Sequence, residues 1–177
     1  TPLDANVGAN SVVIQVADAT GATGTESFTI TVANTNDAPA VSSTAVTSAT
    51  EDAAYSYSIT TSDDDSDSSD SWTISCTTCP SWLSISHTAG ASTATLSGTP
   101  LNANVGDNSV VISVADAASA TGTQSFTIAV ANANDAPTIT STAVTAATED
   151  TAYTYTVTTS DADSGDTVTL TGTTVPS

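Results

Sequence analysis

The chain has 177 residues, with no Lys or Arg and 19 Asp plus Glu, so its formal net charge is −19. Binding to nucleic acid relies on cationic side chains that displace counterions from phosphates, so this composition excludes it. It also offers no basic patch for anionic lipid. No apolar run approaches the ~18 residues of a membrane span, so membrane insertion is not expected. Charged residues make up only 11% and hydrophobic ones 38%, which favours a folded protein.

The sequence repeats itself with an offset of 98 residues, since residues 1–18 read TPLDANVGANSVVIQVAD and residues 99–116 read TPLNANVGDNSVVISVAD. The match continues through the Asn-Asp-Ala-Pro segments at 36–39 and 134–137. Two whole copies would be longer than the chain, so we expect a window on a longer array with a cut domain at each end.

Short runs with a period of two follow one another along the repeat. After a strand expected near or just before residues 44–46, the side chains of Tyr55, Tyr57 and Ile59 alternate with polar ones. Further runs lie at 72–74, 83–85, 94–97, 109–114 and 126–130. Gly, Asn, Asp and Pro separate these runs, and none has helical periodicity. About seven short strands in a ~98-residue repeat predict an all-β fold of tandem Greek-key β-sandwiches.

A C-x-x-C motif, Cys76 to Cys79, stands directly before Pro80. A thioredoxin-like redox site would need a helix after the motif, and a zinc site would need two more nitrogen or sulfur ligands. The second copy has Gly172 and Val175 at these positions, so the fold does not require the thiols. We predict a local disulfide that closes a turn, with free thiols or an intermolecular bridge as alternatives. A disulfide would fit an extracellular setting.

The acidic residues gather in two clusters at matching positions of the repeat. The first cluster is Glu51, Asp52, Asp63, Asp64, Asp65, Asp67 and Asp70, and the second is Glu149, Asp150, Asp161, Asp163 and Asp166. Calcium prefers six to eight oxygen ligands from carboxylates, Asn side chains and carbonyls. Each Asp-x-Asp pair offers two carboxylates on one loop, and neighbouring like charges favour a bound cation. We interpret the clusters as calcium sites. The alternative is a solvated acidic loop.

Three motifs carry a family resemblance. They are the Asn-Asp-Ala-Pro segments, the Pro-Ser-Trp-Leu run at 80–83 followed by Leu-Ser-Gly-Thr-Pro at 96–100, and Val-Ala-Asp at 16–18 and 114–116. With them the chain resembles the tandem cadherin-like and Ig-like repeats of prokaryotic surface proteins, especially the dystroglycan-type cadherin-like domain. The resemblance implies a complete repeat at 37–134. It also implies the C-terminal part of a repeat at 1–36 and the N-terminal part of the next at 135–177.

The resemblance also implies calcium between successive domains, as in cadherins. The first junction would use Asn34, Asn36, Asp37, Glu51, Asp63 and Asp65, and the second would use Asn132, Asn134, Asp135, Glu149, Asp161 and Asp163. Asp18 and Asp116, each near the end of a strand in the preceding domain, would contribute from above. Where cadherins have a Leu-Asp-Arg-Glu element, this chain has Thr-Pro-Leu followed by Asp4 or Asn102.

These features predict a structural repeat of a long extracellular adhesin stalk or surface filament, with joints stiffened by calcium. Its partners would be neighbouring repeats or copies of the same chain, with a glycan or cell-surface ligand as a further candidate. The alternative function is a glycan- or protein-binding module, which an exposed aromatic platform near Trp82 would favour. An enzyme is not expected, because His87 is the only His and no Ser-His-Asp set is apparent. The strands at the two ends could also be completed by neighbouring chains.

Overall fold

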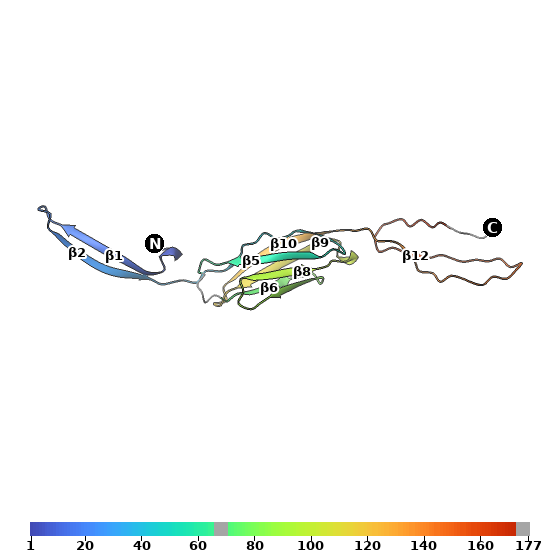
Figure 1. Ribbon diagram of the computed structural model, residues 1–177, viewed down its shortest axis with the longest axis horizontal. Helices are drawn as coiled ribbons and strands as arrows, with labels where there is room; N and C mark the ends of the chain where they lie inside the picture. Colours follow the sequence, from blue (N-terminus) through green and yellow to red (C-terminus); the bar gives the residue numbers. More distant parts are fainter. Residues whose placement is uncertain (66–70, 173–177) are drawn as a thin grey trace.

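The computed structural model describes residues 1–65 and 71–172. Asp67 and Asp70 of the first acidic cluster lie outside these residues. Three parts follow one another along one long axis (Figure 1): a hairpin, a two-sheet sandwich, and a C-terminal part that runs out and back. Two 3-10 turns, η1 (Asp4–Asn6) and η2 (Asn102–Asn104), occupy equivalent positions of the repeat. Neither turn has the length or the apolar character that a membrane-spanning helix requires, and the described residues contain no other helix.

The sandwich consists of two four-stranded sheets. One sheet has the order β3 (Ala40–Val41), β5 (Tyr55–Ser62), β8 (Thr93–Gly98), β7 (Leu83–His87). The other has the order β4 (Ser48–Thr50), β10 (Thr121–Ala131), β9 (Gly106–Ala115), β6 (Thr73–Thr78). Within the sandwich, only the β7–β8 and β9–β10 connections stay in one sheet, and the others cross between sheets. The predicted all-β sandwich is confirmed.

The strand predicted near or just before residues 44–46 is in fact two short strands, one in each sheet. β3 pairs antiparallel with β5, whereas β4 pairs parallel with β10. The backbone carbonyl of Ser43, which lies between them, accepts hydrogen bonds from the Tyr57 hydroxyl at 3.1 Å and from Gln124 Nε2 at 2.8 Å. Because these bonds satisfy a backbone carbonyl of the crossing segment, they help the edge strand to leave one sheet and join the other.

The core lies between the two sheets. On β5 the buried side chains of Tyr55, Tyr57 and Ile59 alternate with exposed ones, as the period of two predicts. The core residues are Tyr55, Tyr57, Ile59, Trp72, Ile74, Leu83, Ala94, Leu96, Val110, Ile112, Val114, Ile128 and Val130. Tyr57 also meets Phe126 edge to face, with ring centroids 5.8 Å apart. Such aromatic pairs contribute beyond their buried area.

Cys76 and Cys79 form a disulfide at the end of β6, with their Cα atoms 5.6 Å apart. The pairing of β6 with β9 shifts register between Cys76 and Thr78, which marks an irregularity in this edge strand. The disulfide closes the short loop that leads from this edge toward β7. It therefore restrains a position where the ladder of hydrogen bonds is interrupted.

The hairpin is made of β1 (Gly8–Ala17) and β2 (Thr23–Val32), and it repeats the pairing of β9 with β10. Val12 lies opposite Phe28, as Val110 lies opposite Phe126. In the C-terminal part, β11 (Thr138–Ile139) pairs with β12 (Thr159–Ser160) in the register that joins β3 to β5. The described residues of the end parts thus reproduce local pairings of the sandwich without a second layer.

The repeat offers a matched test of this core, because Ile128 is 0% exposed and its counterpart Ile30 is 50% exposed. We expect Ile128→Ala to lower the free energy of unfolding of the sandwich by about 2–5 kcal/mol, since it opens a cavity. Ile30→Ala removes the same atoms and should change it by less than about 0.5 kcal/mol. Urea unfolding followed by tryptophan fluorescence measures this, because both Trp residues lie in the sandwich. Equal losses would contradict the described core.

Candidate metal centre

Strand direction decides which acidic residues meet at each end of the sandwich. We call residues 33–39, where the hairpin joins the sandwich, the first junction, and residues 132–137, where the C-terminal part begins, the second junction. β4 runs parallel to β10 with Thr50 opposite Ala131, so Glu51 leaves its sheet at the second junction. β9 runs antiparallel to β10, so Asp116, which follows β9, lies at the first junction and not at the second, where the resemblance placed it.

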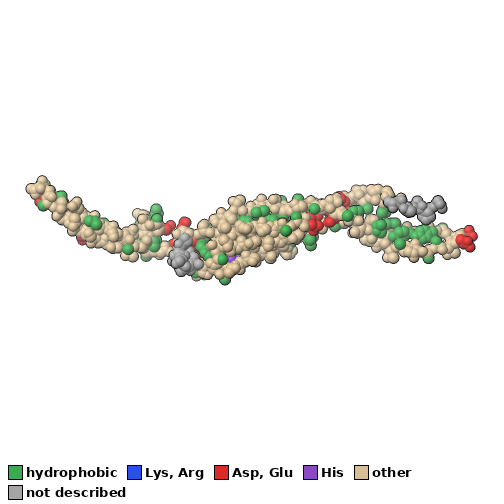
Figure 2. Space-filling view, viewed as in Figure 1, with side chains coloured by type: hydrophobic (Ala, Val, Ile, Leu, Met, Phe, Trp, Pro, Cys, Tyr) green, Lys and Arg blue, Asp and Glu red, His purple; other side chains and the backbone are tan. Residues whose placement is uncertain are grey.

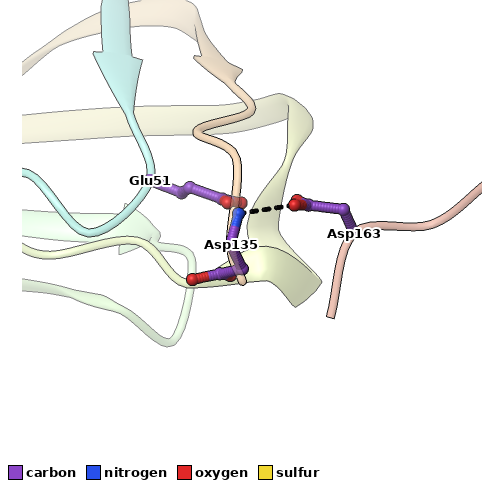
Figure 3. A group of neighbouring side chains, drawn as sticks. All are labelled: Glu51, Asp135 and Asp163. Carbon is purple, nitrogen blue, oxygen red and sulfur yellow. Dashed lines mark hydrogen bonds between the residues drawn. The ribbon is translucent and has the colours of Figure 1, made fainter. Parts of the chain in front are cut away.

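Three carboxylates from three separate segments meet at the second junction (Figure 3). Glu51 follows β4, Asp135 lies in the linker after β10, and Asp163 follows β12. One carboxylate oxygen of each lies within 4.8 Å of the others. Glu51 is 1% exposed and Asp163 is 6% exposed, so two of the three charges are removed from water. The group therefore joins the sandwich to the part that follows it.

Neutral donors hold these carboxylates in place. The backbone N–H of Asp135 donates to Asp163 Oδ2 at 2.6 Å, and Asn132 Nδ2 donates to Asp163 Oδ1 at 2.9 Å. Asn102 Nδ2 donates to Asp135 Oδ2 at 2.7 Å and to Glu51 Oε1 at 3.4 Å. Among the described residues, Glu51 Oε2 is buried and has no hydrogen-bond partner. A buried, unpartnered carboxylate oxygen beside two other carboxylates is costly unless a cation neutralises it.

A second acidic group adjoins the first. Single carboxylate oxygens of Asp161, Asp163 and Asp166 lie within 4.8 Å of one another. The backbone N–H of Asp163 donates to Asp161 Oδ1 at 3.0 Å, which keeps this Asp-x-Asp loop tightly turned. Because Asp163 belongs to both groups, the two share one carboxylate.

The first junction repeats part of this arrangement. The backbone N–H of Asp37 donates to the Asp65 carboxylate, and the backbone N–H of Asp65 donates to Asp63 Oδ1 at 3.2 Å. Asp65 Oδ1 is buried without a partner among the described residues. Asn36 Nδ2 donates to Asp116 Oδ2 at 2.8 Å, which ties the linker to the β9–β10 turn. This hydrogen bond is also the main reason why the pKa of Asp116 is lowered.

The negative charge of Asp4 distinguishes the first junction electrostatically. The pKa of Asp37 is raised, first by repulsion from Asp4 and then by repulsion from Asp65. At the second junction the position of Asp4 is occupied by Asn102, whose amide donates hydrogen bonds instead. At this one position of the repeat, the first junction has the carboxylate of Asp4 and the second junction has the amide of Asn102.

Several residues lie elsewhere than the sequence analysis placed them. Glu51 belongs to the second junction and not to the first, because β4 runs parallel to β10. Its counterpart Glu149 is exposed in the C-terminal part, away from both acidic groups described above. Asp18 lies at the tip of the hairpin, at the far end from the first junction (Figure 1). There its carboxylate accepts hydrogen bonds from Thr20 and Ala22, which lower its pKa.

The remaining predicted ligands divide between the two junctions. Asn34 is exposed in the linker of the first junction. At the second, Asn134 Nδ2 donates to the carbonyl oxygen of Asp135 at 2.7 Å, so this amide braces the linker backbone. Asp4 and Asn102 were missing from the predicted ligand set. The signal for them was present, since Thr-Pro-Leu-Asp and Thr-Pro-Leu-Asn occupy one position of the repeat.

Trp82 does not form the exposed platform that a glycan-binding module would use. Its indole Nε1 donates to Asn108 Oδ1 at 3.0 Å, and its ring meets Tyr55 edge to face with centroids 5.7 Å apart. The backbone of Trp82 also lies directly against Gly98, where a Cβ would be 1.9 Å from the Trp82 carbonyl oxygen. Trp82 is therefore a packing residue.

The geometry agrees with the comparisons with known proteins. A family model described as "Putative Ig domain" matches residues 38–131. The chain belongs to this Ig-domain family. No curated protein sequence matches the chain.

Among solved structures, the extracellular domain of Protocadherin GammaB4 matches with a TM-score of 0.58 and 22% identity, over 90% of this chain and 27% of that chain. Protocadherin Gamma B2 extracellular cadherin domains 3–6 match with a TM-score of 0.57 and 18% identity. This match covers 89% of this chain and 40% of that chain. The endo-fucoidan hydrolase MfFcnA4 of glycoside hydrolase family 107 matches with a TM-score of 0.48 and 29% identity, over 75% and 20%. The chain thus spans less than half of each. The protocadherin likeness shows a cadherin-like fold.

A charge-removing substitution tests the buried carboxylate. In EDTA, Glu51→Gln should raise the free energy of unfolding of the sandwich by about 1–3 kcal/mol, because it removes a buried charge and adds an amide donor beside two carboxylates. Glu149→Gln, the same change at the exposed counterpart, should alter it by less than about 0.5 kcal/mol. Urea unfolding in EDTA gives both values. A loss of stability in the Glu51 variant would contradict the described environment.

The repulsion between Asp4 and Asp37 at the first junction can be tested by replacing Asp4 with Asn, the residue that the second junction has at the equivalent position. Asp4→Asn should lower the pKa of Asp37 toward its ordinary value, because Asp4 is the largest cause of the raised value. A raised carboxyl pKa means that the folded chain takes up this proton at a higher pH than the unfolded chain does, so repulsion is relieved on acidification. Side-chain carboxyl NMR titration measures the shift. Asp18→Asn at the hairpin tip is the control and should leave Asp37 unchanged.

Proposed function

We propose that this chain is a rod-forming structural segment of an extracellular, adhesion-type surface protein, and that calcium bound at the second junction stiffens the joint between successive repeats. The observation that carries the proposal is the buried, unpartnered Oε2 of Glu51. This oxygen lies in a group whose other members come from the linker and from the following part of the chain. A cation held there would bind both sides of the joint at once.

The chemistry of the donors favours calcium. Glu51, Asp135 and Asp163 supply carboxylate oxygens, Asn102 and Asn132 have amide oxygens, and no described His or Cys belongs to the group. Hard oxygen donors from several segments, in an irregular arrangement, suit a large and flexible coordination shell. Zinc would favour nitrogen or sulfur ligands, and magnesium a strict octahedron that keeps several waters.

Cation binding would also relieve the charge problem of the chain. A protein without Lys or Arg cannot neutralise 19 acidic residues by internal salt bridges with those side chains. In cation-free solution the joint is held by neutral donors alone, and the carboxylates repel one another across it. Calcium would turn this repulsion into attraction between the sandwich and the part that follows, and bending at the joint would become costly.

Shape and covalent structure support a mechanical and extracellular role. The three parts lie end to end rather than folding back on one another (Figure 1). The Cys76–Cys79 disulfide is of a kind that persists in oxidising compartments. The printed names of the protocadherin neighbours describe extracellular domains. We therefore place this chain outside the cell, with neighbouring repeats as its first partners.

An enzymatic role has less support. The acidic groups lie at the joints and hold linker backbone and amide donors, as a structural site does. A described groove of about 390 Å³ on the β5–β8–β7 sheet has mostly Ser, Thr and Ala side chains along it and none of the acidic ones. The packed position of Trp82 likewise removes the main argument for a glycan-binding module.

Calcium titration tests the proposal. At a calcium concentration tenfold above the Kd, linkage predicts a stabilisation of about 1.4 kcal/mol. For a domain of this size that corresponds to a rise in Tm of about 5–10 °C over the value in EDTA. Calorimetry gives the affinity, and small-angle X-ray scattering with and without calcium should show a longer and less variable particle when calcium is bound.

Two matched variants assign the response to the second junction. Glu51→Gln should abolish most of the calcium-dependent rise in Tm, whereas Glu149→Gln should keep it. An unchanged melting curve in millimolar calcium, or equal effects of the two variants, would overturn the proposal. A magnesium response as large as that of calcium would overturn the choice of metal.

A further inference from the structure

The amide of Asn102 lies among the carboxylates of the second junction. Its Nδ2 donates to Asp135 Oδ2 at 2.7 Å and to Glu51 Oε1 at 3.4 Å, so one –NH2 group serves two of the three carboxylates of the candidate metal group. Figure 2 shows acidic side chains gathered where the sandwich meets the C-terminal part, and the chain has no Lys or Arg to pair with them. The N–H dipoles of Asn102 thus bring to this place the partial positive charge that its carboxylates attract.

The fold of the sandwich delivers this amide to the joint. Asn102 begins η2, the 3-10 turn between β8 and β9. Just before this turn, the carbonyl of the buried Pro100 accepts a hydrogen bond at 2.9 Å from the backbone N–H of Asp52. Because Asp52 directly follows Glu51, this bond fastens the start of η2 beside the end of β4. The sandwich therefore holds the amide of Asn102 and the carboxylate of Glu51 next to each other.

The hydrogen bond from Asn102 to Asp135 crosses the joint, because Asp135 lies in the linker after β10. Within the described residues it is the only hydrogen bond to the Asp135 carboxylate. The backbone N–H of Asp135 in turn donates to Asp163 at 2.6 Å. Sandwich, linker and following part are thus connected through one amide and two carboxylates (Figure 3 shows the acidic members). Without the amide, the carboxylates of Glu51 and Asp135 would repel each other with no described donor to either.

We propose that the amide of Asn102 takes the place of the cation in the ion-free joint and competes with it for Glu51 and Asp135, so that Asn102 sets the calcium concentration at which the ion binds. This inference rests on the proposed function of the second junction. The N–H bonds of Asn102 direct their positive ends at two of the oxygens that would ligate the ion, and a cation repels them. Binding of the ion therefore releases both hydrogen bonds, and their loss lowers the affinity.

Truncation of Asn102 distinguishes this competing role from a purely structural one. The affinity reflects the difference in free energy between the ion-bound and the ion-free joint. If the hydrogen bonds of Asn102 exist only in the ion-free joint, their removal destabilises that state alone and binding becomes tighter. We expect about a tenfold lower Kd, the factor that corresponds to one hydrogen bond to a charged group. A residue that shapes the site or ligates the ion would give a higher Kd when it is truncated.

Two variants at this position and one control make the test, all in the full chain. Asn102→Ala removes the amide, and Asn102→Asp replaces its –NH2 group by a carboxylate oxygen. The turn accepts an acid, because Asp4 begins η1 and the residues that flank η1 and η2 have nearly the same backbone angles. Gln15→Ala is the control, since Gln15 is an exposed amide of β1, near the hairpin tip.

The backbone amide NMR signal of Asp135, followed during calcium titration at constant ionic strength, reports on the second junction. Its Kd should fall about tenfold in Asn102→Ala, fall further in Asn102→Asp, and stay unchanged in Gln15→Ala. In the unmodified chain the side-chain –NH2 signals of Asn102, identified by their loss in Asn102→Ala, should shift with the same midpoint. Small-angle X-ray scattering in EDTA should show a looser joint in both Asn102 variants.

The outcomes separate this inference from the proposed function. If calcium binds the unmodified chain and Asn102→Ala has an equal or higher Kd, the competition is overturned and the calcium joint stands. Side-chain signals of Asn102 that do not respond to calcium would overturn it as well. If neither the unmodified chain nor the Asn102 variants bind calcium, the proposed function and the competition fail together. Unchanged scattering of the Asn102 variants in EDTA would overturn the role of the amide in holding the ion-free joint.

Discussion

The arrangement of this molecule depends on one electrostatic constraint, which is that its carboxylates have no Lys or Arg to pair with. Among the described residues, the donors to these carboxylates are backbone N–H groups, the hydroxyl of Thr20 and the amides of Asn. Asp163 accepts from Asn132 and from the backbone of Asp135, and Asp116 accepts from Asn36. These neutral donors fix the positions of the carboxylates but leave their negative charge in place. The carboxylates at the two junctions are therefore held in fixed positions and still keep their negative charge.

Strand direction decides which of these unpaired carboxylates are brought together. Only three residue pairs join β4 to β10, yet this short parallel contact brings Glu51 to the end where the chain leaves the sandwich. A site built there needs the sandwich, the linker and the following part together, because each supplies one carboxylate. Its formation is thus coupled to the relative placement of successive parts of the chain. The same logic puts Asp116 at the opposite end, where it holds Asn36 and with it the preceding linker.

The sequence was sufficient for the fold class and for the existence of the acidic joints. Alternation at Tyr55, Tyr57 and Ile59 predicts a half-buried strand, and recurrence of the acids at one register marks them as part of the repeat. The assignment of Glu51 to a junction failed because a three-residue parallel pairing is set by packing between sheets and leaves no local pattern. The split of the first strand into β3 and β4 depends on hydrogen bonds to Ser43 from distant parts of the chain, which no local pattern reveals.

The turn position held by Asp4 in one copy and Asn102 in the other gives the repeat an adjustable element. It is exposed or half-buried, lies outside the sandwich core, and still reaches the joint. A single change between acid and amide there alters the charge of one joint while the strands on either side stay the same. In the proposed array of repeats, the residue at this position would set which joints carry an additional negative charge and therefore which joints have the stronger internal repulsion.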